Sequence, residues 1–143
     1  MKRPCVLVTG ATGRLGQLLL RHFANDFDLR ATCLNPTALP GVATADLSLV
    51  DQCDLRLFAG VDVVVHCAGQ ASSAASWADV QRHNVDATFN VFETAARAGI
   101  GRVVFMSSNW TMAGYRFGTE ILTEALPPRP TNPYGVSKVV GER

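Results

Sequence analysis

The sequence predicts an α/β fold, a doubly wound parallel sheet, and three observations support this class. Short apolar runs alternate with stretches in which apolar residues recur at helical spacing. The connections between them are short, which favours right-handed crossovers between parallel strands. A glycine-rich turn over residues 10–16 joins the first apolar run to the first helical stretch. We expect strand order 3-2-1-4-5, which places the switch point, where ligands bind in such sheets, between the first and fourth strands.

The first half of the chain is expected to supply four strands and two helices. Continuous apolar runs are typical of strands buried on both faces. The strands are predicted at residues 5–9, 28–34, 42–45 and 61–67, of which the third is the weakest. The first helix carries apolar residues at helical spacing, namely Leu15, Leu18, Leu19 and Phe23. A second, short helix is predicted over residues 51–58.

The second half is expected to hold a long amphipathic helix, a fifth strand and a final helix. The long helix spans residues 77–98 and stops at Gly99 and Gly101. The strand spans residues 102–107, and a loop of roughly twenty residues follows, a length that favours a functional role. Four prolines exclude regular structure within this loop: Pro127, Pro128, Pro130 and Pro133. Asn132 is placed to cap the last helix, with Pro133 at its first position.

Composition limits the class of protein. With 143 residues, 48% of them hydrophobic and 17% charged, the chain is expected to be one globular domain over residues 1–143. A formal charge of +1 without a basic stripe argues against nucleic acid or an anionic membrane as a partner. No apolar run is long enough for a signal segment or a membrane span. Four cysteines without C-x-x-C spacing favour buried thiols over disulfides or zinc, and hence a cytoplasmic protein: Cys5, Cys33, Cys53 and Cys67.

Three glycines follow the first predicted strand and open the first helix. Gly10 allows the tight turn, Gly13 lets the backbone approach a pyrophosphate, and Gly16 lets the helix pack close to the sheet. The helix start then offers free N–H groups and a positive dipole end to phosphates. A tight strand–helix turn without a ligand is the alternative, but the flanking strand and helix favour a nucleotide.

Tyr134 and Lys138 stand four residues apart in the last predicted helix, so they lie on one face, one turn apart. An ammonium beside a phenol favours the phenolate form, so such a pair can exchange protons nearer neutral pH. An exposed helix face is the alternative interpretation of the pair.

Six motifs in this order resemble the extended short-chain dehydrogenase/reductase family, the NAD-dependent epimerase/dehydratase group, from Val6 to the last residue. They are TGATGRLG (9–16), ADL (45–47), VVHCAG (64–69), Asn84-Val85 in the long helix, FMSS (105–108) and YGVSK (134–138). Tyr-x-x-x-Lys alone proves little, whereas all six together are specific. The run SSN (107–109) followed by PYGVSK is most similar to uronate dehydrogenases and related sugar oxidoreductases.

The resemblance implies a Rossmann domain that binds NAD or NADP and acts on a sugar-type substrate. It implies that Tyr134 exchanges a proton with the substrate, that Lys138 stabilises the phenolate and holds the nicotinamide ribose, and that Ser108 orients the substrate oxygen. Asn84 would support this site, and Asp46 would contact the adenine. The implied cofactor contacts are Gly10, Thr12, Gly13, Arg14, Leu15, Gly16, Asp46, Leu47, Ala68, Gly69, Tyr134 and Lys138. The implied substrate contacts are Ser72, Ser108, Asn109 and Tyr134.

Some of these residues also have a simpler interpretation. Ser107 and Asn109 are rivals of Ser108, because the loop length shifts the alignment by one residue. Asp46 is alternatively an ordinary turn residue, and Asn84 a satisfied polar residue in a half-buried helix.

Three further residues are expected to be structural. His66 lies in an apolar strand, and Phe89 and Phe92, three residues apart, are expected in the core. In the family the helix over 77–98 often joins a dimer interface, so a homodimer through this helix and the helix starting at Pro133 is plausible.

Two departures from the family pattern leave alternatives open. No carboxylate follows the second strand in residues 31–35, where an acidic residue usually binds the ribose of NAD, so NADP is kept beside NAD. Arg14 and Arg30 would favour a 2′-phosphate, or else are surface charges. The chain ends five residues after Lys138, so we expect a sheet incomplete at its C-terminus and no substrate lobe.

Three functions follow from these expectations. The first is an NAD(P)-dependent oxidoreductase acting on a sugar or sugar acid, within a chain that is a fragment of a longer enzyme. The second is a nucleotide-sugar epimerase or dehydratase. The third is a nucleotide-binding module without catalysis, if the early end is genuine.

Overall fold

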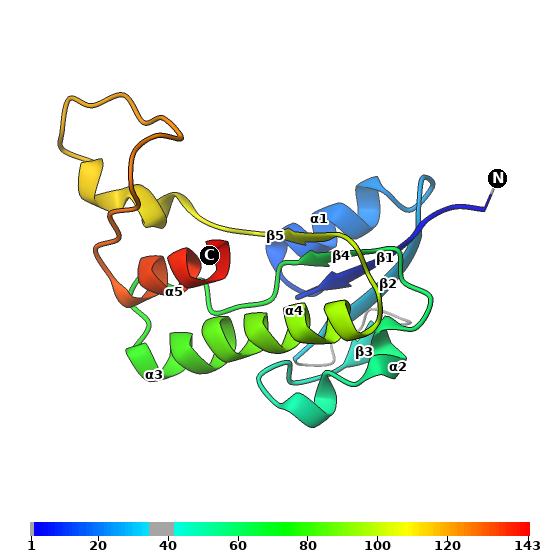
Figure 1. Ribbon diagram of the computed structural model, residues 1–143. Helices are drawn as coiled ribbons and strands as arrows, with labels where there is room; N and C mark the ends of the chain where they lie inside the picture. The colour runs from blue at the N-terminus through cyan, green and yellow to red at the C-terminus, as the bar shows by residue number, and fades with distance from the viewer. Residues whose placement is uncertain (1, 35–41) are drawn as a thin grey trace.

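The computed structural model describes residues 2–34 and 42–143. Within them, five parallel strands form one sheet in the order β3-β2-β1-β4-β5, which confirms the predicted order (Figure 1). The strands are β1 (Cys5–Thr9), β2 (Asp28–Cys33), β3 (Val42–Thr44), β4 (Val63–His66) and β5 (Val103–Phe105). The α-helices are α1 (Arg14–His22), α2 (Leu55–Phe58), α3 (Trp77–Val80), α4 (Ala87–Arg97) and α5 (Pro133–Glu142).

The two faces of the sheet are covered by different helices, α1 on one and α4 on the other (Figure 1). Side chains of a strand alternate between the two faces. The main core lies between α4 and the sheet and includes Cys5, Leu7, Val64, Val91 and Ala95. In β1, Thr9 is level with Thr32 of β2 and with His66 of β4, so these strands end together at the switch point.

The helix predicted over residues 77–98 is divided into three parts. Between α3 and α4 the backbone forms a π-helical segment, η2 (Gln81–Asp86). A π turn accommodates an extra residue, is rare, and occurs often at functional sites. Here it carries Asn84, which is only 2% exposed.

Phe89 is not in the core, contrary to the prediction. The buried stripe of α4 is set by Ala87, Val91 and Ala95, which recur every four residues. Phe89 follows Ala87 by two residues, roughly 200° around the helix, and is therefore 64% exposed. Phe92 packs against the core as expected.

The short helix predicted over residues 51–58 is also divided. A 3-10 turn, η1 (Val50–Gln52), precedes α2. Asp54 separates them because its carboxylate accepts the Arg56 N–H at 2.7 Å and caps a new helix start.

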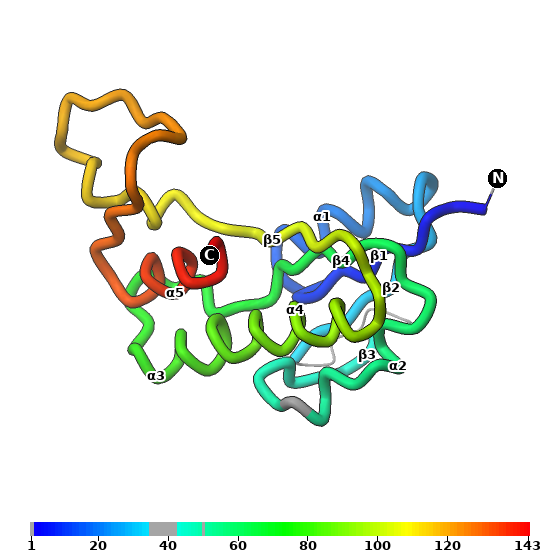
Figure 2. Tube along the Cα trace, viewed as in Figure 1, coloured from blue at the N-terminus to red at the C-terminus, as the bar shows by residue number. Residues whose placement is uncertain are grey.

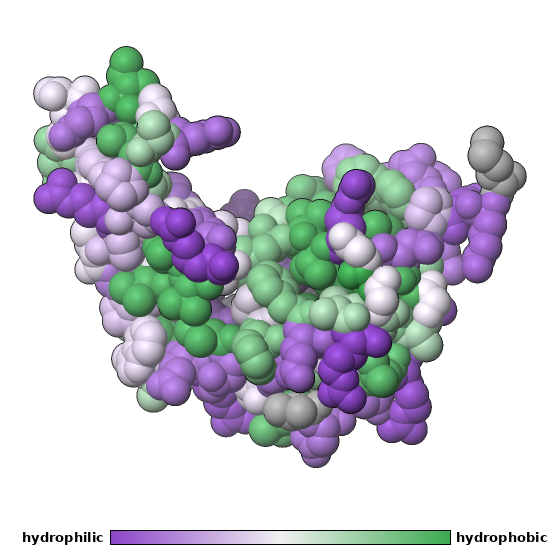
Figure 3. All heavy atoms as spheres, viewed as in Figure 1, coloured by the Kyte–Doolittle hydropathy of each residue, from purple (hydrophilic) through white to green (hydrophobic). Residues whose placement is uncertain are grey.

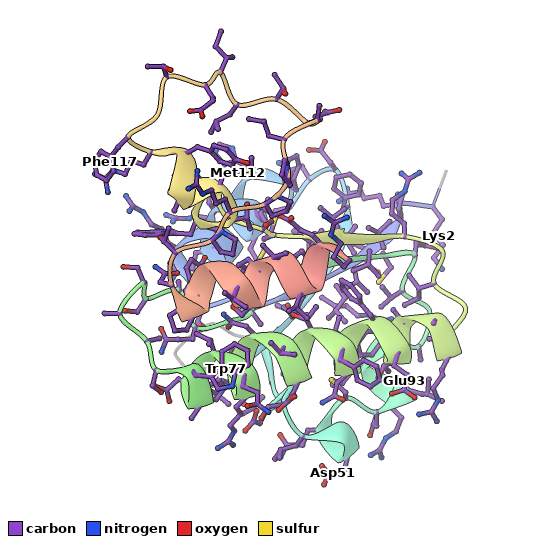
Figure 4. All side chains as sticks on the ribbon, turned by 60° about the vertical axis from the view of Figure 1, so that its left-hand side comes forward. Lys2, Asp51, Trp77, Glu93, Met112 and Phe117 are labelled. Carbon is purple, nitrogen blue, oxygen red and sulfur yellow. The ribbon has the colours of Figure 1, made fainter. Side chains whose placement is uncertain are left out.

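The loop before α5 is irregular over residues 116–132, the part that contains the prolines before α5, but its first part is not. It begins with a 3-10 helix, η3 (Asn109–Tyr115), in which Ser108 accepts the Trp110 N–H at the start. Beyond η3 the chain projects from the body and returns to α5 (Figure 2). Phe117 is 94% exposed and points away from the body (Figure 4). The space-filling view shows a hollow between this projection and the rest of the molecule (Figure 3).

In residues 2–34 and 42–143, no helix is both long and apolar enough to cross a membrane.

Candidate active site

The glycine turn between β1 and α1 is pressed against the chain that leaves β4. Gly10 has φ +66°, and a Cβ there would lie 2.7 Å from the Ala68 backbone. A Cβ on Gly16 would collide with the Gly10 carbonyl. Gly13 is the N-cap of α1 and has no side chain to cap it, so the first N–H groups of this helix remain available to a ligand.

A pocket of about 340 Å³ opens at the switch point. It contains seven of the residues implied for cofactor binding: Gly10, Thr12, Gly13, Asp46, Leu47, Ala68 and Gly69. The remaining lining residues are Cys33, Leu34, Ala45, Ser48, Cys67, Gln70, His83 and Ala87. Arg14 and Leu15 lie at the exposed start of α1, outside this lining set. The glycine turn and the ends of β2, β3 and β4 are therefore brought to one concave site.

Asp46 follows β3 and is fixed by several hydrogen bonds. Its Oδ1 accepts from Ser48 Oγ at 2.6 Å and from the Ser48 N–H at 3.1 Å. Its Oδ2 pairs with Arg82 Nη2 at 2.6 Å. Burial would raise the pKa of this carboxyl, but the bonds from Ser48 and Arg82 outweigh burial, and the pKa is lowered. Asp46 is therefore an ionised acceptor in the pocket wall.

Asn84 joins the pocket to α5. Its Oδ1 accepts the Gln70 N–H at 2.6 Å, and its Nδ2 donates to the Gln70 carbonyl at 3.1 Å and to Ser137 Oγ at 2.8 Å. Ser137 is 1% exposed and donates to the Tyr134 carbonyl at 2.7 Å. The π turn thus directs one amide to two segments that flank the candidate site.

Lys138 is buried beside Tyr134, as the four-residue spacing predicts. Its Nζ donates to the Met106 carbonyl at 2.9 Å and lies 5.9 Å from the centre of the Tyr134 ring. Burial lowers the pKa of the Lys138 ammonium, and nearby Cys67 acts in the opposite direction. The pair faces inward, because Tyr134 is 8% and Lys138 5% exposed.

Ser107 and Ser108, which lie between β5 and η3, and Asn109, which begins η3, have different surroundings. Ser107 donates a short hydrogen bond to Glu142, so its hydroxyl is engaged with the end of α5. Ser108 caps η3, which packs on α5, and Asn109 is exposed. Asn132 caps α5 by accepting the Gly135 N–H at 2.7 Å, as predicted.

His66 is buried and bonded on both sides of its ring. Its Nδ1 lies 2.7 Å from Thr9 Oγ1, and its Nε2 lies 3.1 Å from Thr88 Oγ1. Thr9 Oγ1 also accepts the Ala68 N–H at 3.2 Å, so this hydroxyl joins the ring to the chain that leaves β4. Burial, and secondly Lys138, lowers the pKa of His66 to about 3. The ring is thus neutral, and its hydrogen bonds connect β1, β4 and α4.

Other implied contacts lie away from the pocket. Ser72 is exposed and its Oγ accepts the Ala74 N–H. Arg30 donates to the Ala59 carbonyl at 2.5 Å, in the middle of β2, so it does not reach the pocket wall. Asn35, which completes the run without a carboxylate, lies outside the described residues.

Several residues of the site were not singled out from the sequence. Ser137 lies inside the YGVSK motif, but only Tyr134 and Lys138 of this motif have a chemistry that their spacing predicts. Arg82, Ser48 and Gln70 have no motif of their own, and only the fold brings them to Asp46 and Asn84.

Comparison with known proteins yields sugar dehydrogenases over the whole chain. L-arabinose 1-dehydrogenase (NAD(P)(+)) of Haloferax volcanii is 35% identical over 96% of this chain and 58% of its own length. Uronate dehydrogenase of Agrobacterium fabrum is 37% identical over 99% of this chain and 54% of its own length. The chain spans little more than half the length of these relatives.

A solved structure and a family match agree with these relatives. A mutant uronate dehydrogenase from Agrobacterium tumefaciens, complexed with NAD, has a TM-score of 0.86 at 34% identity, covering 98% of this chain and 54% of that one. Residues 6–143 match the family described as NAD dependent epimerase/dehydratase. The chain therefore belongs to the NAD-dependent epimerase/dehydratase family.

Proposed function

We propose that the chain forms the NAD(P)-binding and proton-transfer part of an oxidoreductase that acts on a sugar or sugar acid. The position of Gly69 carries this proposal. Gly69 lines the pocket, and a Cβ on it would lie 2.9 Å from Asn84 Oδ1 and 3.7 Å from Lys138 Nζ. The dinucleotide pocket and the Tyr134–Lys138 pair are therefore contiguous. The substrate class follows the names of the relatives, which act on a uronate or on L-arabinose.

The residues present fit a dinucleotide. A Cβ on Gly10 or Gly16 would collide with neighbouring backbone atoms, so both positions require glycine for this tight turn. The uncapped start of α1 leaves N–H groups that suit a pyrophosphate. Asp46 and Leu47 would hold the adenine end, and Ala68 and Gly69 would pass beside the nicotinamide ribose.

Proton transfer would be carried out by Tyr134. The bound cofactor supplies hydride transfer. The Lys138 ammonium stabilises the phenolate, while Asn84 and Ser137 hold the turn that carries both residues. Ser108 is favoured over Ser107 for orienting the substrate oxygen, because the Ser107 hydroxyl is engaged with Glu142.

Gly13→Val should weaken binding of NAD⁺ and NADP⁺ by about tenfold or more, because the side chain would occupy the place of the pyrophosphate. Gly13 has φ −70°, which other residues can adopt, but a Cβ there would lie 3.1 Å from the Gly10 oxygen, so the turn must shift by a few tenths of an ångström to accept the change. Isothermal titration measures the affinities, and Gly101→Val is the matched control, because a Cβ there meets nothing within 4 Å. Equal affinities in parent and Gly13→Val would refute this placement of the cofactor.

Turnover separates the enzyme classes. An oxidoreductase accumulates NAD(P)H when a panel of aldoses and uronates is offered with the oxidised cofactor. An epimerase or dehydratase converts nucleotide sugars without net NAD(P)H, and a binding module does neither.

We further propose a homodimer through the outer side of α4 and α5. A cavity there is lined by apolar side chains, among them Phe89, Phe92 and Val140, and by charged ones at its margin, among them Asp86 and Glu93, the latter labelled on α4 in Figure 4. The exposed Phe89 gives a second copy a large apolar side chain to cover.

Phe89→Asp should therefore shift the particle from a dimer to a 15.3 kDa monomer in light scattering. The change places a charge in the apolar interface. Phe117→Asp is the control, because that ring is 94% exposed on the projecting loop. A monomeric parent, or a dimer that survives Phe89→Asp, would exclude this interface.

We also propose a cytoplasmic location, as expected for thiols that are not oxidised. Cys5, Cys53 and Cys67 are free, and burial raises the pKa of each thiol. Fractionation of cells that express the chain tests this proposal.

A further inference from the structure

Asp46, Ser48 and Arg82 form a closed ring of hydrogen bonds in the pocket wall. Arg82 Nη2 donates to Asp46 Oδ2 at 2.6 Å, and Arg82 Nε donates to Ser48 Oγ at 3.1 Å. Ser48 Oγ in turn donates to Asp46 Oδ1 at 2.6 Å. Arg82 comes from the π turn, whereas Asp46 and Ser48 follow β3, so the ring ties two parts of the chain together.

This ring leaves the carboxylate one acceptor position. An ionised carboxylate offers about four lone-pair positions. Both positions of Oδ1 are filled, by Ser48 Oγ and by the Ser48 N–H. One position of Oδ2 is filled by Arg82. The position left on Oδ2 suits one N–H donor, and the hydrogen bonds from Arg82 and Ser48 fix the direction in which it points.

The surroundings of Asp46 suit a flat apolar ring that carries such a donor. Leu34, Ala45, Leu47 and Ala87 line the same pocket and offer only apolar side chains. A 6-aminopurine presents an exocyclic N–H to an acceptor, whereas a 6-oxopurine presents a carbonyl oxygen at that place. Two acceptors cannot hydrogen-bond each other, and the N–H of a 6-oxopurine lies at N1 instead, so a carboxylate held toward position 6 should bind the 6-oxopurine less tightly.

We propose that Arg82 is a specificity-determining residue, which holds Asp46 in the orientation that selects a 6-aminopurine dinucleotide over a 6-oxopurine one. The inference rests on the proposed function, in which Asp46 faces the adenine. Arg82 acts through Asp46 and is a positioning residue, since its own hydrogen bonds go to Asp46 and Ser48.

The test is the ratio of dissociation constants for NAD⁺ and nicotinamide hypoxanthine dinucleotide, measured by isothermal titration on the intact chain. The parent should prefer NAD⁺ by about tenfold. In Arg82→Gln the carboxylate loses the hydrogen bond from Nη2, and Ser48 Oγ loses the one from Nε, so the preference should fall below about threefold. Arg56→Gln is the matched control, because it removes an ion pair of the same 2.6 Å length, with Asp54, away from this pocket.

A second substitution distinguishes positioning from a general structural effect. Asp46→Asn introduces an amide donor and should abolish the preference. Adding Arg82→Gln to Asp46→Asn should then change the ratio no further, because Arg82 has no carboxylate left to position.

Each outcome has a defined meaning. NAD⁺ binding without a preference, or an Arg82→Gln ratio within twofold of the parent, overturns this inference and leaves the proposed function standing. A change of ratio in Arg56→Gln equal to that in Arg82→Gln overturns it also. Failure of the parent to bind either dinucleotide overturns the proposed function and the inference together.

Discussion

Replacing Tyr134 by Phe is expected to lower turnover of a sugar or uronate substrate by about 10²–10⁴-fold, the range for loss of a general acid or base. The affinity for NAD⁺ should change little. Phe keeps the ring, which is 8% exposed and lies beside Lys138 Nζ, so the packing of α5 should persist. Only the hydroxyl that exchanges the proton is removed. Steady-state kinetics, in this chain or in a longer form that contains it, measure the effect.

The chain supplies a matched control for this experiment. Its other tyrosine, Tyr115, donates its hydroxyl to the Pro127 carbonyl at 3.0 Å, on the projecting side of η3. Tyr115→Phe should leave turnover within a few-fold of the parent. If Tyr134→Phe does the same, Tyr134 is not the proton-transfer group. If it instead abolishes NAD⁺ binding, the hydroxyl serves cofactor binding or folding, and a role in proton transfer is not supported.

The order of the strands could be predicted because the signals that determine it are local. A buried apolar run followed by Gly10, Gly13 and Gly16 specifies a strand, a turn and a helix, and alternation then fixes parallel crossovers. The interior of the long helix could not be predicted in the same way. Nothing in Gln81–Asp86 predicts a π turn, because such turns are rare insertions of a single turn within an otherwise α-helical pattern.

The error at Phe89 has a related cause. Three-residue spacing from Phe92 is compatible with a shared face, but the face that is buried is chosen by the close packing of Ala87, Val91 and Ala95 against the sheet. Which stripe of a helix meets the sheet is a tertiary property. Two aromatic residues alone do not determine it.

The candidate site was predictable where one short segment contains the chemistry. Tyr134 and Lys138 share a helix, and the glycine turn is contiguous in sequence. The contacts that hold them are long-range: Asn84 reaches Ser137 across 53 residues, and Arg82 reaches Asp46 across 36. No spacing rule predicts such pairs, because they depend on where η2 lies relative to α5 and to the segment after β3.

Acidification from pH 6.5 to 4.5 is expected to destabilise the folded chain through His66 by about 2.3 kcal/mol. The pKa of the folded imidazole is about 3, against 6.5 for an ordinary histidine. Between these values the unfolded chain binds a proton that the folded chain does not, so stability rises with pH. The slope should approach about 1.4 kcal/mol per pH unit below pH 6. The pKa of Asp46 is lowered from 3.8, so its effect on stability is lost mainly at pH values below this window.

Urea unfolding at several pH values measures this slope. His66→Gln should flatten it, although the variant should be less stable near neutral pH because Thr9 and Thr88 lose their ring partner. His22→Gln, at an exposed position of α1, should leave the slope unchanged. If His66→Gln does not fold, NMR titration of the parent decides the matter: a His66 ring that gains a proton above pH 5 contradicts the expectation. A neutral ring at that pH means that the hydrogen bonds of His66 to Thr9 of β1 and Thr88 of α4 persist through the acid range in which exposed histidines become charged.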